Sequence, residues 1–596
     1  MTDLETEAVH APYRLAEQLE LRLGPAEDPA NPFSFRACLD LDEREEFPAG
    51  PCARLEELGV HAYYVPAEHG GRLENYEQLL QVMRTVARRD LTVAIGHGKT
   101  YLGGVCVWVA GDQEQADRLA EAIHAGLPVS LGLTERAHGS DLLAGEVRAE
   151  PDGDGGWLVS GEKWLINNAT RGSLISLLTR TDPAGGPRAF SILLVDKRKL
   201  PQGSYRHLDK VHTHGIRGAD ISGIAFDRAP VPASAVVGDV GGGLETVLKA
   251  LQLTRTMCAA LSLGAADHAL ALGLEYAGQR RLYGRTLAEL PKSRRELAES
   301  TVDVLTHEAL ALVASRAVHT APQELSLSAA VTKYLVPTGT EAVIGQLTRL
   351  LGARAFLKGV HADGRFQKVD RDHRIVGLFD GNTLVNLNSL VGQFRSLTRA
   401  YRRGSGQPAG AVAAFTLAEP LPPLAPERMS LVARHGSGVL ASLPDSVAAL
   451  RAAAEEDPAH KPALAAAETL LAVVAEVHEE MERHQNAVTE VSPAAFETAR
   501  RWSLCFAAAS CLGVWAYNRE SAERGGTAEL WQGALWLRAS LARLLVRLGV
   551  PEGADPEAYD GVLTAALDLH GDGRLVSLLP FRRATTVFPN HTEEAS

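Results

Sequence analysis

The change in hydrophobic period along the chain is the sequence feature that most constrains its fold. Apolar residues recur at helical spacing up to about residue 126, for example in residues 52–58 and 76–88. From residue 127 to about 239, short β-like runs replace this pattern, and clusters of Gly, Pro and Asp separate them. The helical period returns at residue 243 and persists to about residue 399. The sequence therefore predicts helices, then a sheet, then helices.

The β-like runs are short and evenly spread over about 110 residues. Such runs with turn signals between them predict a small antiparallel barrel or sandwich. They cover residues 129–134, 157–160, 174–179, 190–195 and 221–226.

The remainder of the chain predicts an additional helical domain. A Gly- and Pro-rich segment at 402–426 is typical of a linker, and an Ala- and Leu-rich region with helical spacing follows it. The predicted fold class is mainly α with a central β domain. We expect an N-terminal helical domain at 1–126, a middle β domain at 127–239, a helical bundle at 240–401, the linker at 402–426, and a C-terminal helical domain at 427–596.

Charge and composition exclude several classes of protein. The formal net charge of −13 argues against a nucleic-acid partner, which requires a basic surface. Six cysteines without a CxxC pair or ligand-like His clustering predict free thiols in a reducing cytoplasm and no metal site. We found no uninterrupted apolar run of about 18 residues, since even 257–274 carries Asp267 and His268. With no signal-peptide pattern either, we expect a cytoplasmic protein without a membrane span.

A turn signal at residues 379–383 interrupts two apolar helical patterns within 368–391. It places the carboxylate of Asp380 on a tight loop in apolar surroundings, where a carboxylate can work as a general base. The alternative is that Asp380-Gly381 is simply a turn and that Asp380 caps the next helix. Both interpretations remain open on this stretch alone.

Two motifs in the β region offer groups that bind a heterocycle. Residues 131–141 (LGLTERAHGSD) end a strand and provide hydroxyls and free backbone amides. Residues 161–168 (GEKWLINN) place a large ring and an amide on a second strand. Residues 96–100 (GHGKT) lack the first glycine of a phosphate loop, because Val93 stands there. We interpret them as part of a glycine-bearing helix.

In this order, the motifs resemble those of the acyl-CoA dehydrogenase family, which carries an L-T-E-P-x-A-G-S-D loop and a G-x-K-x-W-I-T-N strand. The resemblance covers about residues 40–395, and the C-terminal region looks like the extension of longer, dimeric members. It implies an FAD-dependent α,β-dehydrogenation of an acyl thioester carried by CoA or by an acyl-carrier protein. It also implies a homodimer that passes electrons to an electron-transfer flavoprotein or another acceptor. Further matching segments are 212–218, 241–244, 252–255, 279–285 and the Asp380 loop.

The resemblance implies roles for residues near the flavin ring. Thr134 would bond the ring edge, and Ser140 would lie near the pyrophosphate or the substrate's pantetheine. Leu165 and Asn167 fall where the family has Trp and Thr beside the ring. The tryptophan of this chain, Trp164, comes one residue early. Asn167 can still donate a hydrogen bond toward the flavin.

The resemblance assigns other residues to the flavin of a neighbouring subunit. Arg280 matches an arginine whose fork suits the pyrophosphate. Arg349 and Gly352 stand where the family's Gln and Gly serve the partner's flavin. Ala353 replaces a glycine that lets backbone approach closely.

The catalytic base implied by the resemblance is Asp380, which stands in the place of the family's glutamate. Because Asp is one methylene shorter than Glu, its carboxylate oxygens reach roughly 1.3 Å less far. Such a misplacement can lower the rate on the order of 100-fold. Arg255 and Gly381 would contact the substrate, and Asn382 the flavin. The other position that carries the base in some members is Thr254, which cannot serve.

Two alternatives to a dehydrogenase stay open. A flavin oxidase or monooxygenase on the same scaffold would be reoxidised by oxygen. A non-catalytic scaffold protein would have lost its base and perhaps its flavin.

Overall fold

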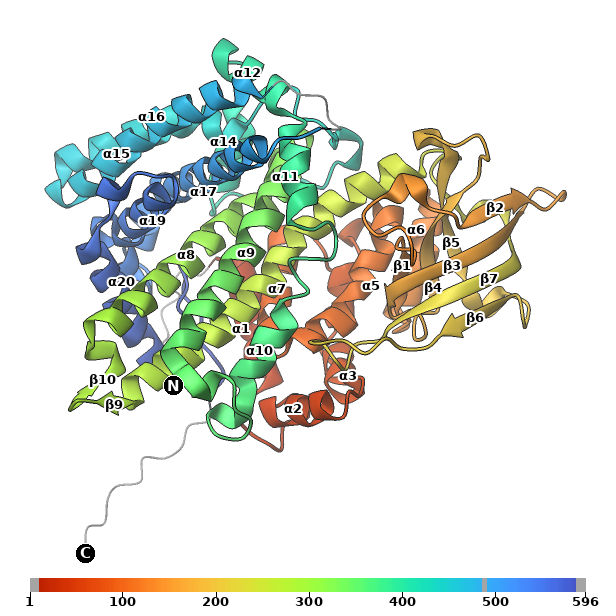
Figure 1. Ribbon diagram of the computed structural model, residues 1–596, viewed down its shortest axis with the longest axis horizontal. Helices are drawn as coiled ribbons and strands as arrows, with labels where there is room; N and C mark the ends of the chain where they lie inside the picture. The colour runs from red at the N-terminus through yellow and green to blue at the C-terminus, as the bar shows by residue number, and fades with distance from the viewer. Residues whose placement is uncertain (1–9, 485–489, 586–596) are drawn as a thin grey trace, which may run out of the picture.

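A computed structural model describes residues 10–484 and 490–585. Figure 1 shows three long helices at the centre, the β domain on one side of them and the C-terminal helices on the other. The predicted fold class, mainly α with a central β domain, is confirmed.

The N-terminal helices pack against the central helices and the β domain. The side chains of Asn75, Asp90 and Asp112 accept hydrogen bonds from the first turns of three of these helices and thereby set where they begin. The helices are α1 (Ala11–Leu23), α2 (Phe35–Glu43), α3 (Ala49–Glu57), α4 (Tyr76–Arg89), α5 (Leu91–Ala110) and α6 (Gln113–His124).

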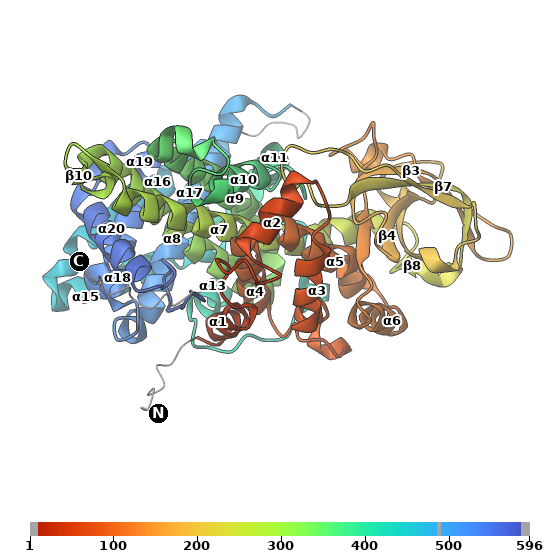
Figure 2. The same cartoon turned by 90° about the horizontal axis from the view of Figure 1, so that it is seen from below.

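The strands of the middle region form one eight-stranded sheet, which curls on itself in Figure 2. Its order is β6-β7-β3-β2-β4-β5-β8, and β1 pairs with β4. The pairs β1–β4 and β2–β4 are parallel, which corrects the purely antiparallel prediction. These strands are not joined by direct hairpins, so nothing in the connections imposes opposite directions. The strands are β1 (Val129–Gly132), β2 (Arg148–Pro151), β3 (Trp157–Asn167), β4 (Leu174–Arg180), β5 (Phe190–Asp196), β6 (Tyr205–Leu208), β7 (Ile221–Val231) and β8 (Val236–Val237).

The central helices are α7 (Gly243–Gln279), α8 (Pro291–Thr320) and α9 (Leu325–Leu351). Helix α7 is long and apolar enough to cross a membrane, but 94% of its most apolar window is buried inside the protein. Its apolar side chains therefore form the core of this fold. A small hairpin, β9 (Arg281–Leu282) and β10 (Arg285–Thr286), follows α7, and α10 (Arg365–His373), α11 (Thr383–Val391) and α12 (Phe394–Arg403) follow α9.

The segment predicted as a linker is packed rather than free. It contains α13 (Pro408–Phe415), whose Ala411, Ala414 and Phe415 are buried. The buried guanidinium of Arg316 on α8 donates to the carbonyls of Ala414 at 2.9 Å and Thr416 at 2.7 Å. The connection is thus fixed to the central helices by side-chain hydrogen bonds.

The C-terminal helices cover α8 on the side away from the β domain (Figures 1 and 2). Their core includes the fully buried rings of Trp502, Trp515, Trp531 and Trp536. The helices are α14 (Gly438–Ala441), α15 (Leu443–Glu456), α16 (Lys461–Arg483), α17 (Pro493–Ala522), α18 (Ala528–Trp531), α19 (Leu535–Arg547) and α20 (Pro556–Gly571).

A buried ionic network joins the N-terminal, central and C-terminal parts. Arg84 of α4 donates to both oxygens of Asp267 on α7, at 2.8 and 2.9 Å. It also donates to Glu308 on α8 at 2.5 Å. Glu308 accepts in addition from Tyr13 of α1 at 2.7 Å and from Ser577, beyond α20, at 2.5 Å. The network satisfies charges that would be costly to bury alone.

Candidate active site

The loop between α10 and α11 has a strained backbone at its tip. Asp380 and Gly381 adopt φ values of +56° and +93°. A Cβ at residue 381 would lie 2.9 Å from Nη2 of Arg255, so this position needs glycine. Asn382, not Asp380, caps α11, because its side chain accepts from the Val385 amide at 3.0 Å. The alternative of Asp380 as the helix cap is therefore wrong, and the side-chain oxygen of Asn382 is used within the loop.

The carboxylate of Asp380 is largely buried, with 10% of the side chain exposed. Its Oδ2 lies 3.4 Å from Nζ of Lys99 on α5 and 3.8 Å from Sγ of Cys258 on α7. Burial raises the pKa of the Cys258 thiol to about 12, so this thiol keeps its proton. Lys99 also lies over the Phe379 ring, 3.8 Å from its centroid. The carboxylate is thus held between a cation and a neutral donor.

Arg255 fixes the backbone of the same loop. Its Nε donates to the Asp380 carbonyl at 2.8 Å, and the side chain is buried. Burial lowers the pKa of Arg255, and the neighbouring Asp380 opposes this effect. Arg255, assigned above to the substrate, therefore also positions the loop that carries Asp380.

Asp380 lines a largely apolar cavity with about 440 Å³ of empty space, part of it open to solvent. It lies between α4, α5 and α7. Among its lining residues, Asp380 is the one carboxylate and Lys99 the one cation, and the side chains of Tyr64, Tyr101 and Cys258 are neutral. An apolar cavity with a few convergent polar groups suits an apolar chain that carries one reactive end. Its apolar lining includes Leu79, Met83, Ile95, Leu102, Met257 and Leu261.

The loop after β1 is held to β3 by a buried ion pair. The Thr134 carbonyl accepts from the Trp164 amide at 2.9 Å. Lys163 pairs with Glu135 at 2.7 Å, and Glu135 also accepts from the amides of Glu146 and Val147. Burial opposes the ionisation of Glu135, but Lys163 and these amides outweigh it and hold its pKa below the usual value.

The end of β3 presents the other two predicted ring contacts. Leu165 is 40% exposed and has φ +55°, at a shift in register between β3 and β7. The side-chain oxygen of Asn167 is buried without a hydrogen-bond partner. Asn168 donates to the Gly96 carbonyl of α5 at 2.9 Å, three residues before Lys99. Helix α5 therefore connects the Thr134–Asn167 side of the site with the Asp380 side.

These residues fit a flavin. The unpartnered oxygen of Asn167 needs an N–H donor, which the edge of the isoalloxazine ring offers, and the exposed Leu165 offers an apolar surface beside it. Thr134 is half-buried next to the same strand. Ser140 is exposed in the loop that leads away from β1.

The residues assigned to a partner's flavin lie elsewhere. Arg280 follows α7, about 37 Å along this helix from Arg255 at the helical rise. Arg349, near the end of α9, is exposed and donates to the Gly345 carbonyl at 3.1 Å. Gly352 directly follows α9 with φ +60°. The three residues cannot reach the flavin that Thr134 and Asn167 of the same chain would hold.

Sequence reasoning missed Lys99 as a site residue, although a signal was present. Lys99 is the only charged side chain in the twenty residues of α5. A lone cation in an apolar helix demands a partner, and here that partner is Asp380. The partners of Glu135 could not be found from the sequence, since Glu146 and Val147 approach it only through the fold of the loop.

The sequence matches three consecutive parts of one family. They are the N-terminal domain of acyl-CoA dehydrogenases over residues 36–126, the middle domain over 130–229, and the C-terminal domain over 241–393. This chain belongs to the acyl-CoA dehydrogenase family. It is accordingly an FAD-dependent oxidoreductase that acts on CH–CH bonds, and the alternative of a non-catalytic scaffold is set aside.

Similar proteins extend this result. A probable acyl-CoA dehydrogenase, fadE25, of Mycobacterium leprae is 25% identical over 347 residues, which cover 58% of this chain and 87% of that protein. The acyl-CoA dehydrogenase of Bacillus anthracis complexed with FAD has a TM-score of 0.65 at 17% identity and covers 96% of this chain and 92% of its own. The prolyl acyl carrier protein oxidase AnaB has a TM-score of 0.58 at 16% identity and covers 65% of this chain and 99% of its own. The likeness to the Bacillus structure thus includes the C-terminal helices.

Proposed function

We propose that this dehydrogenase desaturates an acyl thioester at its α and β carbons with Asp380 as the base. The observation that supports the proposal is that the Asp380 carboxylate, the one acid among the lining residues, lines the apolar cavity. An acyl chain in the cavity would place its thioester end against this carboxylate. Aspartate in place of glutamate then requires that the loop or the substrate compensates for the shorter reach.

The Asp380 loop would act on the substrate in two ways. The carboxylate takes the proton from the carbon next to the thioester. The N–H of Asp380 donates to no acceptor among the described residues, so it is available to polarise the thioester oxygen and make that proton easier to remove. Arg255 supports both roles because it holds the Asp380 carbonyl at 2.8 Å. When bound, FAD supplies the acceptor for the hydride that leaves the neighbouring carbon.

Lys99 has a positioning role in this proposal. Its ammonium lies 3.4 Å from Oδ2 of Asp380 and contacts the Phe379 ring beside it. It therefore restrains the rotamer of a short side chain whose reach leaves little tolerance. Lys99 also gives the cavity a positive group, which would favour a substrate with a polar or anionic group near its reactive end.

A homodimer forms part of the proposal. Arg280, Arg349 and Gly352 lie too far from the chain's own flavin contacts, and large apolar side chains near them are uncovered: Tyr283 is 94% and Phe356 is 87% exposed. A second subunit would cover these side chains and receive the arginines at its flavin. We further propose that electrons leave to an electron-transfer flavoprotein and that the enzyme is cytoplasmic.

An oxidase acting on an acyl-carrier-protein thioester is the second candidate. It is favoured by the unusual base, Asp380, with Lys99 beside it, and its fold precedent is the prolyl acyl carrier protein oxidase. Oxygen consumption without an added electron acceptor separates the two candidates, because only the oxidase turns over under those conditions.

The test is an anaerobic titration of the FAD-loaded protein with a panel of acyl-CoA and acyl-carrier-protein thioesters, followed at roughly 450 nm, where oxidised flavin absorbs. We expect one substrate class to bleach the flavin, and Asp380→Asn to slow bleaching by about 100- to 10,000-fold, the range that general base catalysis contributes. Asp370→Asn, an aspartate of α10 paired with Arg374, is the matched control. If no thioester bleaches the loaded wild type, or if Asp380→Asn bleaches like the control, the proposed reaction is wrong.

A further inference from the structure

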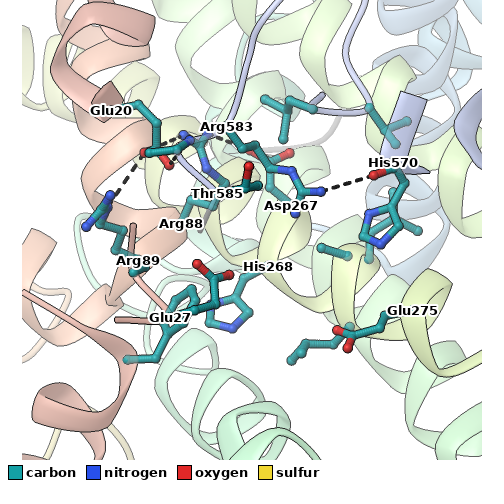
Figure 3. A pocket seen from close by; sticks show the side chains of 18 of the residues that line it. Glu20, Glu27, Arg88, Arg89, Asp267, His268, Glu275, His570, Arg583 and Thr585 are labelled. Carbon is teal, nitrogen blue, oxygen red and sulfur yellow. Dashed lines mark hydrogen bonds and ion pairs between the residues drawn. The ribbon is translucent and has the colours of Figure 1, made fainter. Parts of the chain in front are cut away.

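A second cavity lies at the boundary between the N-terminal helices and the C-terminal end of the chain (Figure 3). It has about 800 Å³ of empty space and is separate from the acyl cavity, with which it shares no lining residue. Helices α1, α4 and α7 form one part of its wall. Helix α20 and residues 574–585 form the other.

The segment after α20 forms a small hairpin that closes this cavity. Within it, the Leu575 amide donates to the Phe581 carbonyl at 2.9 Å. The hairpin is fixed to α1, because the amides of Arg582 and Ala584 donate to Glu17 at 2.9 Å and to Glu20 at 3.4 Å. The family's C-terminal domain ends at residue 393, so this part of the wall belongs to the added C-terminal region.

Several charges around the cavity form ion pairs that do not involve the hairpin. Arg84 binds Asp267 and Glu308, as described above. Glu20 lies 3.1 Å from Arg88 and 3.6 Å from Arg89. Three arginines thus balance three carboxylates.

The hairpin adds Arg583, which belongs to none of these ion pairs. Among the described residues its side chain makes one hydrogen bond, a donation from Nη2 to the His570 carbonyl at 3.3 Å, and its Nε is buried without a partner. Burial and then the neighbouring Arg88 lower the pKa of Arg583, and Glu27, Glu20 and Glu275 oppose this effect without forming a close ion pair with it. Nη1 of Arg88 is likewise buried without a hydrogen-bond partner, 3.7 Å from Asp267. Two guanidinium groups therefore have donors to spare at the same end of the cavity.

The rest of the cavity offers acceptors. Buried His268 lies within hydrogen-bonding reach of the Arg88 backbone, and its Nε2 has no partner among the described residues. Glu27 and Glu275 also line the cavity, and Figure 3 shows them to either side of His268. The carboxylates lie near Arg365, and neither forms an ion pair of 4 Å or less among the described residues. A ligand there would have to bring hydrogen-bond donors.

We propose that this cavity is a binding site for a small phosphorylated ligand with hydroxyl groups, such as a sugar phosphate. The phosphate would lie between Arg583 and Arg88, because guanidinium forks match its oxygens. The hydroxyls would donate to His268, Glu27 and Glu275. The site is distinct from the acyl cavity and does not depend on the reaction assigned to Asp380.

The test uses the FAD-loaded, full-length protein in a buffer free of phosphate and sulfate. Ribose 5-phosphate, inorganic phosphate and ribose are compared by thermal unfolding and by titration calorimetry. We expect a rise in Tm of about 2 °C or more with 10 mM ribose 5-phosphate, by linkage of binding to folding. Phosphate should bind more weakly, and ribose should give no shift.

Arg583→Gln is the decisive variant, with its exposed neighbour Arg582→Gln as the matched control. We expect Arg583→Gln to weaken ribose 5-phosphate binding at least tenfold and Arg583→Lys to retain part of it. Without ligand, Arg583→Gln should be about as stable as the wild type, since Arg583 forms no ion pair of 4 Å or less among the described residues and makes one long side-chain hydrogen bond. An arginine with a purely structural role would instead lower Tm when removed.

Three results would overturn the site. The first is a wild-type Tm that does not change with ribose 5-phosphate. The second is a loss of binding in Arg582→Gln as large as that in Arg583→Gln. The third is an Arg583→Gln protein that binds like the wild type but has a lower Tm without ligand. Stronger binding of inorganic phosphate than of ribose 5-phosphate would exclude the sugar and leave the free anion as the ligand.

Discussion

The two cavities of this enzyme are built in opposite ways. The acyl cavity is lined mainly by apolar side chains, and its two charged groups, Lys99 and Asp380, pair with each other. The C-terminal cavity is lined by arginines, carboxylates and histidines, and one of its arginines, Arg583, forms no ion pair of 4 Å or less among the described residues. Packing of apolar side chains therefore determines the properties of the acyl cavity, and electrostatic interactions determine those of the C-terminal cavity. We therefore expect substitutions of charged residues to change rate at the acyl cavity and stability at the C-terminal cavity.

The largest effect on stability is expected for Arg84→Met, behind the C-terminal cavity. The change leaves the carboxylates of Asp267 and Glu308 buried without their shared cation. We expect a loss of about 3–5 kcal/mol in the free energy of unfolding, measured in urea.

Arg36→Met provides the control, because Arg36 forms an exposed pair with Asp40 on α2 and such pairs contribute about 0.5 kcal/mol or less. If Arg84→Met lowered the free energy of unfolding no more than Arg36→Met does, the buried network would not stabilise the wall of the C-terminal cavity. The contrast between the two cavities would then weaken.

A smaller, pH-dependent effect is expected for His268, which lines the C-terminal cavity. Burial lowers its pKa to about 3, whereas an unfolded histidine titrates near 6.5. The unfolded state therefore gains a proton as the pH falls below 6.5 while the folded state does not, so stability is lost from 6.5 down toward 3. At pH 5 this loss amounts to about 2 kcal/mol relative to pH 7.5.

The measurement is the difference in unfolding free energy between pH 7.5 and pH 5, in wild type and in His268→Gln. We expect a smaller difference in the variant, because glutamine does not titrate. His435→Gln, which replaces an exposed histidine, should keep the wild-type difference. Identical pH dependence in all three proteins would contradict the assignment of a neutral His268 to the cavity wall.

The smallest effect is expected at the acyl cavity, for Lys99→Met. Methionine retains the bulk but releases the Asp380 carboxylate from its ion pair. We expect flavin bleaching by the best thioester to slow by about tenfold, because a small misplacement of a short base lowers its efficiency. The free energy of unfolding should fall less than in Arg84→Met, because one carboxylate rather than two loses its cation and Cys258 remains as a donor to it.

Stopped-flow absorbance under anaerobic conditions gives the rate, and urea unfolding gives the stability. Lys292→Met, at an exposed position of α8, is the control. A stability loss of several kcal/mol with an unchanged rate would reverse the contrast and make Lys99 a structural residue.

The sequence predicted the order of layers but not the finer features of the sheet. The change of hydrophobic period locates the β region and strands β1, β3, β4, β5 and β7. The short strands β2, β6 and β8 were missed, because two or four residues of partly exposed chain carry no readable alternation. The parallel pairing of β1 with β4 depends on tertiary contacts that no local pattern records.

The candidate sites show the same limit. Asp380 could be found because a turn signal interrupts two helical patterns. The C-terminal cavity could not, because Glu20, Arg88, His268 and Arg583 become neighbours only through folding. The pairing of Lys99 with Asp380 joins residues 281 positions apart, so the sequence signals a cation in an apolar helix but not its partner.

The contacts of Glu308 have a consequence for how this protein is made. The family's three domains are complete once residue 393 has been synthesised. Yet Glu308, within the third domain, is fully buried and accepts hydrogen bonds from Ser577 and from the Leu578 amide at 2.8 Å. During synthesis, more than 180 residues must be added after residue 393 before Ser577 and Leu578, the last partners of this carboxylate, are present. A chain released early would keep the contacts of Glu308 with Arg84 and Tyr13 but would lack the two hydrogen bonds from the C-terminal region, so we expect the two parts to reach their final packing together.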